Sequence, residues 1–253
     1  MRMQPLPSPY NFFSTVPRFH PITPHIWRLN LSWHLRLPLF PPIPVAVWLV
    51  KEGEDWTVVD TAHPDHAAIV AKAVGRLLGS ARPSRLVLTH AHIDHGGGMR
   101  ALILRWDLPV WAHALEAGFV TGELSYRQLE SESLVFNLSR ALLPQVAWKV
   151  PVSRSLHEGD TVGGMQVIHV PGHTPGMIAL YHRADRAIIC GDAFMNLRGN
   201  LSGPFAVGTP DPDSARRSMK KLAGLDFEVL LPSHDASARG IPAGAVRRFV
   251  SRL

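Results

Sequence analysis

The 253-residue chain has a single cysteine, Cys190, so it cannot form an internal disulfide. Disulfides persist in oxidising compartments, and a chain without them is typical of a reducing one. We therefore expect a cytoplasmic protein. Cys190 ends an apolar, strand-like run, and we interpret it as a small buried residue and not as a ligand.

Long apolar runs are also missing. The apolar stretch from Pro38 to Val50 is too short and too often interrupted by proline to cross a bilayer. Residues 1–13 have no continuous apolar core of the length that a signal peptide needs. The first 50 residues contain no acidic residue and ten prolines, which oppose an amphipathic helix. We expect an N-terminal arm over residues 1–25 and no membrane span.

Internal repeats are absent at periods of roughly 20 to 50 residues, which excludes a solenoid. The length suits one compact domain, residues 1–253. The formal net charge of +6 would suit a nucleic-acid partner if the cations formed one basic surface. Much of the excess instead lies on one predicted helix and near the C-terminus, where a solvated face is the commoner explanation: Arg216, Arg217, Lys220, Lys221, Arg239, Arg247, Arg248 and Arg252. We therefore expect a small-molecule substrate and no nucleic acid.

Potential metal ligands are concentrated in one stretch, residues 89–97, directly after a strand-like run. Six consecutive positions hold four of them: His90, His92, Asp94 and His95. Imidazole nitrogens and carboxylate oxygens are good zinc ligands, but four so close together cannot sit on one regular element and bind one ion tetrahedrally. The three glycines at 96–98 allow a turn that spreads them before a helix begins near Met99. The spacing favours two metal ions.

Three motifs further along the chain each contain one more histidine or aspartate of the kind that binds metal ions. His173 lies in the turn sequence Val-Pro-Gly-His-Thr-Pro-Gly, and Asp192 and His234 each follow an apolar, strand-like run. Upstream, Asp60 lies at the end of the run Trp-Thr-Val-Val-Asp. Ligands at strand ends agree with the usual position of sites in open sheets.

These motifs resemble, in their order, the signature of the metallo-β-lactamase superfamily, and the resemblance runs from about Ile26 to His234. It implies an α/β protein with a four-layer αββα sandwich that holds a one- or two-metal site between its sheets. It also implies a role for each motif residue. His90, His92 and His173 would hold a first ion, Asp94, His95 and His234 a second, Asp192 would bridge them, and Asp60 would orient the ligand loop.

The resemblance further implies the chemistry. Two divalent ions, zinc with manganese or iron as alternatives, would lower the pKa of water so that a bridging hydroxide attacks an ester, thioester or lactone carbonyl, while Asp94 moves the proton. Asp192 favours the two-metal hydrolases over the true β-lactamases, and His92 disfavours the flavin-partnered di-iron members. Glyoxalase-II-like and lactonase-like members are the most similar. Two alternatives stay open, an iron-dependent persulfide dioxygenase and a phosphodiesterase or nuclease.

The hydrophobic pattern predicts strands at residues 26–31, 45–50, 56–60, 85–88 and 109–113, with helices at 64–78 and 99–106. A helical cap is expected over residues 114–148, with Tyr126, Arg127, Phe136 and Arg140 as candidate pocket residues. The second half is expected to begin with strands at 155–157 and 165–170 and to continue with strands at 177–182, 187–190 and 227–231. Asp211 and Pro212 begin a predicted helix that Gly224 ends.

The histidines and tryptophans outside the motifs have ordinary explanations. We interpret seven histidines as surface or structural residues: His20, His25, His34, His66, His157, His169 and His182. His63 and His113 stay open, because both lie at strand ends near the expected site. Four aromatic residues would suit a dimer surface or a membrane-facing surface, although packing in the core or along the active site is favoured: Trp27, Trp33, Phe40 and Trp48. A homodimer is therefore an open expectation.

Overall fold

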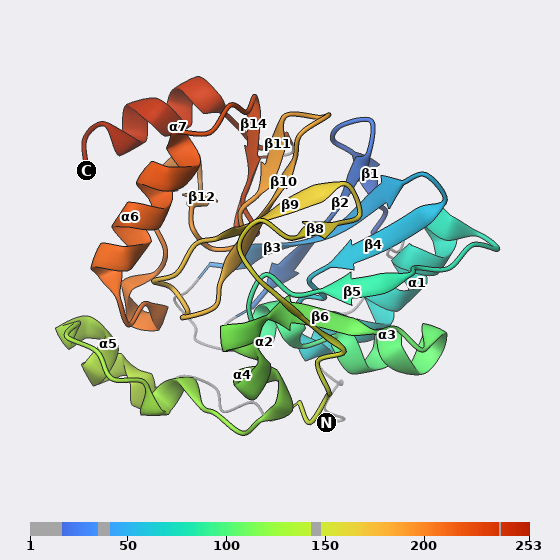
Figure 1. Ribbon diagram of the computed structural model, residues 1–253, viewed down its shortest axis with the longest axis horizontal. Coiled ribbons are helices and arrows are strands. Elements are labelled where there is room, and N and C mark those ends of the chain that lie inside the picture. The colour runs from blue at the N-terminus through green and yellow to red at the C-terminus, as the bar shows by residue number, and fades with distance from the viewer. Residues whose placement is uncertain (1–16, 35–40, 143–147, 238) are drawn as a thin grey trace, which may run out of the picture.

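The computed structural model describes residues 17–34, 41–142, 148–237 and 239–253. Two β-sheets face each other, and helices cover the outer face of each, which gives the four-layer αββα arrangement expected from the sequence (Figure 1). Phe40 and most of the expected N-terminal arm lie outside the described residues. Among the described residues, no helix combines the length and apolarity that a membrane crossing needs.

The first sheet has seven strands in the order β1-β2-β3-β4-β5-β6-β7. They are β1 (His20–Pro21), β2 (Ile26–Trp33), β3 (Ile43–Glu52), β4 (Asp55–Val59), β5 (Arg85–Val87), β6 (Val110–His113) and β7 (Arg154–Leu156). The second sheet has the order β15-β14-β11-β10-β9-β8, and a small third sheet pairs β12 with β13. These strands are β8 (Thr161–Val162), β9 (Met165–His169), β10 (Ile178–His182), β11 (Ala187–Ile189), β12 (Met195–Leu197), β13 (Asn200–Ser202), β14 (Val229–Leu231) and β15 (Ile241–Pro242).

Short helices and 3-10 turns connect the strands. The helices are α1 (Ala67–Leu78), α2 (Ile93–Gly96), α3 (Met99–Trp106), α4 (Ala117–Thr121), α5 (Leu134–Ser139), α6 (Pro212–Ala223) and α7 (Ala243–Val250). The 3-10 turns are η1 (Pro64–His66), η2 (Ala114–Glu116), η3 (Tyr126–Gln128), η4 (Arg140–Leu142) and η5 (Ala206–Gly208). The part of the predicted cap that the structure describes before residue 143 therefore consists of short helical turns.

The central strands bury both of their faces, as β3 illustrates. Successive side chains of a strand point to opposite faces, so Trp48 packs between the two sheets while Leu49 faces α1 and α3. The second sheet repeats this arrangement with α6 and α7, whose Met219 and Val246 pack on its outer face. The fold therefore has three apolar layers, and the polar ligands collect at one end of the middle layer.

The helix boundaries follow local sequence signals. Pro64 occupies the first position of η1, where its missing N–H costs nothing, and α1 follows directly. Gly79, with a φ of 62°, ends α1. At the other predicted helix, the side chain of Asp211 accepts a hydrogen bond from the Ser214 N–H at 2.8 Å and caps α6.

The predicted membership of one strand is wrong. β7 pairs in parallel with β6 and so belongs to the first sheet, whereas the sequence analysis placed residues 155–157 at the start of the second half. Only Leu156 of this three-residue strand is buried, so its pattern gives no indication of its partner. The short strands β8, β12, β13 and β15 and the helix α7 were not predicted either. Within the expected arm, His20–Pro21 forms the edge strand β1.

The tryptophans of the first sheet pack within the chain. Trp48 is fully buried, with the Arg28 guanidinium 5.2 Å from its ring centroid. Trp27 lies against Trp56 at 5.1 Å, and Trp33 stacks on His63 at 5.3 Å. Intramolecular packing therefore accounts for these side chains, and a homodimer stays an expectation.

Candidate metal centre

The ligand loop begins where β5 ends and turns into the single helical turn α2. His92 has an extended backbone and precedes this turn, so His90 and His92 project before it while Asp94 and His95 lie on it. The following glycines are required by close packing. A Cβ on Gly97 would lie 2.3 Å from the Ile93 carbonyl oxygen. The chain therefore spreads four neighbouring side chains in different directions.

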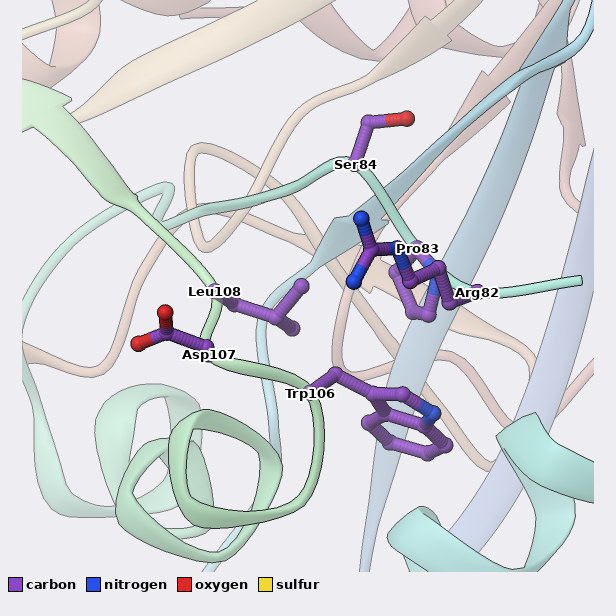
Figure 2. A pocket seen from close by; sticks show the side chains of 6 residues that line it. All are labelled: Arg82, Pro83, Ser84, Trp106, Asp107 and Leu108. Atoms are coloured by element: carbon purple, nitrogen blue, oxygen red, sulfur yellow. The ribbon is translucent and has the colours of Figure 1, made fainter.

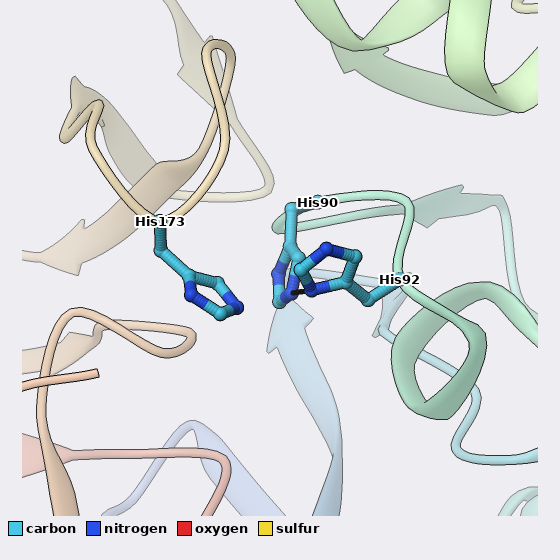
Figure 3. A group of neighbouring side chains, drawn as sticks. All are labelled: His90, His92 and His173. Carbon is cyan, nitrogen blue, oxygen red and sulfur yellow. Dashed lines mark hydrogen bonds between the residues drawn. The ribbon is translucent and has the colours of Figure 1, made fainter. Parts of the chain in front are cut away.

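Two histidines of this loop meet a third from the second sheet. His90 Nε2 lies 3.1 Å from His92 Nδ1, and His173 approaches the pair from the turn after β9 (Figure 3). One donor atom from each of these three side chains lies within 4.8 Å of the others. His90 and His173 are buried and His92 is partly exposed. This triad corresponds to the first predicted group.

Asp94, His95 and His234 form a second triad with the same donor spacing. Asp94 Oδ2 lies 3.3 Å from His234 Nε2 and 3.8 Å from His95 Nε2. His234 reaches the triad from the loop after β14, in the second sheet, while the other two come from α2. The structure therefore brings together the second predicted group as well.

Asp192 lies between the two triads. Its carboxylate oxygens are 3.4 Å from His173 Nε2, 3.2 Å from His95 Nε2 and 3.1 Å from His234 Nε2. One of these imidazoles belongs to the first triad and two to the second. The carboxylate is therefore placed to serve both groups at once.

Several polar atoms in this cluster are buried without a hydrogen-bond partner. They include His95 Nε2, His173 Nε2 and Asp192 Oδ1. Buried polar atoms in proteins are nearly always paired, so three orphaned atoms within one cluster indicate a site for a bound group. Imidazole nitrogens together with carboxylate oxygens are a donor set that fits divalent metal ions such as zinc, manganese and iron.

The electrostatics of the two triads differ. Burial lowers the pKa of His92 to about 3 and that of His173 to about 4, so both are neutral and have a nitrogen lone pair available. Burial opposes the charged form of His234 too, but the carboxylates of Asp192 and Asp94 outweigh it and raise its pKa to about 10. The protonated imidazole of His234 thus places a positive charge beside the two carboxylates. A bound metal ion would supply this charge in place of the proton.

Asp60, predicted to orient the ligand loop, is fully buried directly behind it. Its Oδ1 accepts a hydrogen bond from the Thr89 N–H at 2.8 Å, and its Oδ2 lies 3.0 Å from His95 Nδ1. This contact holds the proton on Nδ1 and leaves Nε2 of His95 directed at Asp94 and Asp192. The backbone of Asp60 has a φ of 58°, a conformation that L residues seldom adopt.

Replacement of Asp60 by asparagine should weaken metal binding without unfolding the protein. All the partners of the Asp60 carboxylate, which belong to Thr89 and His95, donate hydrogen bonds to it. The NH₂ group of an asparagine cannot accept, so it would face one of these donors without forming a hydrogen bond. We expect metal affinity to fall by about 10- to 100-fold, the usual cost of disturbing a partner of a ligating histidine. Competition with a chromophoric chelator measures this, with the exposed Asp226→Asn as control. Unchanged affinity would remove Asp60 from the site.

His173 and His234, the two histidines that the second sheet presents, each form a hydrogen-bond contact through Nδ1 that the sequence did not reveal. His173 Nδ1 lies 3.1 Å from Thr209 Oγ1, and His234 Nδ1 lies 2.7 Å from the Pro44 carbonyl oxygen. Each contact leaves Nε2 facing Asp192. Pro44 lies in β3 and Thr209 directly follows η5, both far from these histidines in the sequence, so no local motif indicates them.

Glu116 is the most important residue that the sequence analysis did not identify. Its buried carboxylate accepts a hydrogen bond from the Ala91 N–H at 2.9 Å through Oε2 and from the Gly176 N–H at 2.9 Å through Oε1. Ala91 separates His90 from His92, and Gly176 lies in the turn that presents His173. One carboxylate therefore joins the two loops of the first triad. An acidic residue within an apolar helical turn was the available signal.

The predicted pocket residues of the cap differ in position. The ring of Tyr126 lies 4.5 Å from that of His92, and its hydroxyl donates to Glu116. Phe136 is buried in the protein, and Arg140 donates to the Leu129 carbonyl oxygen at 3.1 Å. The Arg127 backbone N–H donates to Ser125 Oγ. Tyr126 is thus the one of the four that these contacts connect to the first triad.

The η5 turn lies against the first triad. A Cβ on Gly208 would lie 3.2 Å from His173 Cε1 and 3.8 Å from His92 Cε1. Just before this turn, the ring of Phe205 lies 6.1 Å from that of His234. The cap contacts the same segment, because Ser139 Oγ donates to the Val207 carbonyl oxygen at 3.0 Å. The segment 205–208, which contains only apolar residues and glycine, therefore lies beside both triads.

The two histidines left open by the sequence lie outside the triads. His63 caps η1 by accepting from the Asp65 N–H. His113 caps η2 and stacks on His169 at 4.2 Å. His169, in turn, has Nε2 2.9 Å from the Pro175 carbonyl oxygen. Their contacts give all three a structural explanation.

His169→Gln should therefore retain metal and most activity. A glutamine amide can donate to the Pro175 carbonyl oxygen as the imidazole does, so the His173 turn keeps its support. Elemental analysis and steady-state kinetics of the variant, compared with the wild-type protein, measure both quantities. If the variant lost both metal ions, His169 would be a ligand and our assignment would be wrong.

A separate hollow of about 340 Å³ lies at the opposite end of β5 from the ligand loop. Six residues line it (Figure 2): Arg82, Pro83, Ser84, Trp106, Asp107 and Leu108. Residues 82–84 precede β5, whereas the ligand loop follows it. Sites in α/β sheets lie at the carboxyl ends of strands, and this hollow has no histidine among its lining residues.

Comparison with known proteins identifies the family. The family model of the metallo-beta-lactamase superfamily matches residues 40–234. A probable metallo-hydrolase of Bacillus subtilis, YflN, is 31% identical over 78% of this chain and 79% of its own length. The chain therefore belongs to the metallo-beta-lactamase superfamily, as the motifs indicated.

Two further relatives carry more specific descriptions. The acyl-coenzyme A thioesterase MBLAC2 of Gallus gallus is 28% identical over 74% of this chain and 71% of its own length. The crystal structure of TTHA1623 in a di-iron-bound form superposes with a TM-score of 0.61 at 29% identity, covering 85% of this chain and 98% of that one. The family and the clustered donors together define a metal-dependent enzyme.

Proposed function

We propose that the chain is a binuclear metallo-hydrolase that cleaves an ester, thioester or lactone bond of a small molecule. His90, His92 and His173 would hold one ion, Asp94, His95 and His234 the other, and Asp192 both. The observation that carries this proposal is the carboxylate of Asp192, which lies within 3.4 Å of imidazole nitrogens from both triads. The di-iron form of TTHA1623 supports a two-metal site on this fold.

Two bound divalent ions would supply hydroxide at neutral pH and polarise the carbonyl group of the substrate. The residues of this chain do the rest. Asp60 orients the imidazole of His95 for metal binding. Thr209 and Pro44 do the same for His173 and His234. Buried neutral imidazoles and two carboxylates keep the net charge of the loaded site small and positive, which suits a reaction that develops one negative charge.

Asp94 is the candidate for proton transfer. It carries a carboxylate in the second triad, and its residue is 8% exposed, so it faces the site with limited contact to solvent. The carboxylates and imidazoles around it compete, and His95 and His234 hold the pKa of Asp94 below its usual value even though burial raises it. An ionised Asp94 can accept a proton from the attacking water and deliver it to the leaving group.

The surroundings of the site favour a small substrate over a nucleic acid. A phosphodiester backbone requires a basic track leading to the metals. On α6, Arg216 pairs with Asp213 at 2.9 Å and Lys221 with Glu158 at 2.9 Å. Beside the triads, the segment around Phe205 and Val207 presents apolar side chains instead. The thioesterase relative supports an acyl compound as substrate.

The experiment is a substrate comparison with and without metal. We expect measurable hydrolysis of aryl esters, acyl thioesters and five-membered lactones, abolished by a chelator and restored by zinc, manganese or iron. Bis-aryl phosphodiesters should react much more slowly. If the phosphodiester had the higher kcat/KM and transfer RNA competed for the site at physiological salt, the enzyme would be a nuclease. A single iron per chain together with persulfide oxidation would instead identify a dioxygenase.

A further inference from the structure

A second group of potential metal donors lies at the far end of the second sheet from the metal centre. β10 begins beside the ligand loop, where the Ile178 N–H donates to the Thr89 carbonyl oxygen at 3.0 Å, and it ends at His182. The turn after β10 carries Asp185, and His25 directly precedes β2 of the first sheet. At about 3.3 Å per residue, the length of β10 puts His182 roughly 13 Å from the ligand loop.

The three side chains converge. His25 Nδ1 lies 2.6 Å from Asp185 Oδ1, and His182 Nδ1 lies 3.6 Å from Asp185 Oδ2. The two imidazole rings stack with their centroids 4.9 Å apart. One donor atom from each residue lies within 4.8 Å of the other two, the same criterion that both triads of the metal centre meet. The group combines two imidazoles with one carboxylate.

The group is buried on one side and accessible to solvent on the other. The side chains of His182 and Asp185 are each 2% exposed, whereas that of His25 is 42% exposed. His182 Nε2 is buried without a hydrogen-bond partner, and the Glu52 carboxylate lies 3.8 Å from it. Burial lowers the pKa of His182, so its imidazole is neutral. A metal ion bound at Nδ1 would replace the hydrogen bond that this atom accepts from the Asp185 N–H at 3.2 Å.

Neighbouring groups fix the carboxylate and leave a route to it. The Thr23 hydroxyl and the His25 N–H both donate to Asp185 Oδ2. A cavity of about 560 Å³ is lined by Asp185 and Thr23 together with Glu228 and Arg239. Oriented ligands and an entry path are two properties that a metal site requires.

We propose that His25, His182 and Asp185 form a further binding site for a divalent transition-metal ion. Two nitrogens and one carboxylate oxygen suit zinc, cobalt, nickel or copper, whereas calcium and magnesium prefer oxygen ligands alone. The ion takes the place of the proton between His25 Nδ1 and Asp185 and releases it to solvent. Because His25 enters the first sheet and His182 and Asp185 belong to the second, the ion joins the two sheets at this edge.

The test is a zinc-binding stoichiometry on the full chain carrying Asp192→Ala. This background weakens the metal centre, and the edge site is measured as the difference in zinc content between His25→Ala and its control in the same background. We expect one zinc equivalent that His25→Ala removes and His157→Ala, which changes another histidine outside the group, retains. Zinc should also raise the Tm of the His157→Ala protein but not that of the His25→Ala protein. Because His25 is partly exposed, its replacement leaves the core intact.

Three results would overturn this assignment. The first is a zinc content of His25→Ala equal to that of the Asp192→Ala parent, and the second is the absence of binding to that parent at about 1 mM zinc. The third is an equal loss of bound zinc in His157→Ala and His25→Ala. None of these results bears on the catalytic proposal, since the wild-type activity and its dependence on the metal centre are measured separately.

Discussion

Asp192→Ala should give a folded protein that has lost most of its metal and almost all of its activity. Among the described residues, Asp192 is the one side chain whose oxygens lie within 3.4 Å of nitrogens from both triads, so its removal disturbs both ions together. Metal ions contribute several kcal/mol to catalysis of this kind, and each 1.36 kcal/mol changes the rate tenfold. We therefore expect kcat to fall by roughly a thousandfold or more. Elemental analysis and ester hydrolysis measure the two effects.

The matched control is Asp226→Ala, which removes an exposed carboxylate paired with Arg186. It should retain metal, activity and fold, because a surface ion pair contributes about 0–1 kcal/mol to stability. Circular dichroism of both variants establishes that they are folded. A fully metallated and active Asp192→Ala protein would contradict the assignment of the bridging ligand.

Glu116→Gln should weaken the first triad more than the second. The carboxylate accepts from the N–H groups of Ala91 and Gly176, and a glutamine can accept from only one of them while its NH₂ group faces the other. A buried donor left unpaired costs about 1–3 kcal/mol, so the Tm should fall. Metal affinity should drop by about 10- to 100-fold, since Ala91 separates two ligands and Gly176 follows the third.

Spectroscopy separates this positioning role from a general loss of stability. In the cobalt-substituted protein, Glu116→Gln should change the absorption of one ion and leave the other unchanged, because the hydrogen bonds of Glu116 support the two loops of the first triad. The control is Glu123→Gln, an exposed acid in the same region. If both ions were lost equally and the cobalt that stays bound had an unchanged absorption spectrum, Glu116 would only stabilise the fold.

The sequence predicted the two triads because their members lie in short motifs at strand ends. His90 to His95 occupy one loop, and His173, Asp192 and His234 each follow a recognisable apolar run. Strand ends at one edge of facing sheets converge, so motifs far apart in sequence meet in space. The αββα architecture followed from the family resemblance of these motifs.

The supporting contacts were not predictable in this way. Thr209, Pro44 and Glu116 have no spacing that relates them to the ligands they hold, because they come from elements far away in the sequence. The edge group escaped for a related reason. His25 and His182 were interpreted as surface or structural residues. His182 is three residues from Asp185 in the sequence, but only the packing of the two sheets brings His25 to them.

Short elements explain the errors in the fold. β7 exposes two of its three residues, so neither its burial nor its pattern shows that it joins β6. The helix α7 buries only Ala243 and Val246, a stripe too narrow to distinguish it from a polar C-terminal segment. Strands of two or three residues, such as β8 and β15, are set by their neighbours and not by their own sequence.

Anomalous diffraction from crystals of the metal-loaded protein, recorded at the absorption edge of the bound metal, tests the central claim most directly. The account predicts two peaks in the centre, roughly 3.5–4 Å apart, as in other two-metal sites. One should lie beside His90, His92 and His173, and the other beside Asp94, His95 and His234, with Asp192 between them. A single peak in the centre, or none in a protein that still hydrolyses esters, would contradict it.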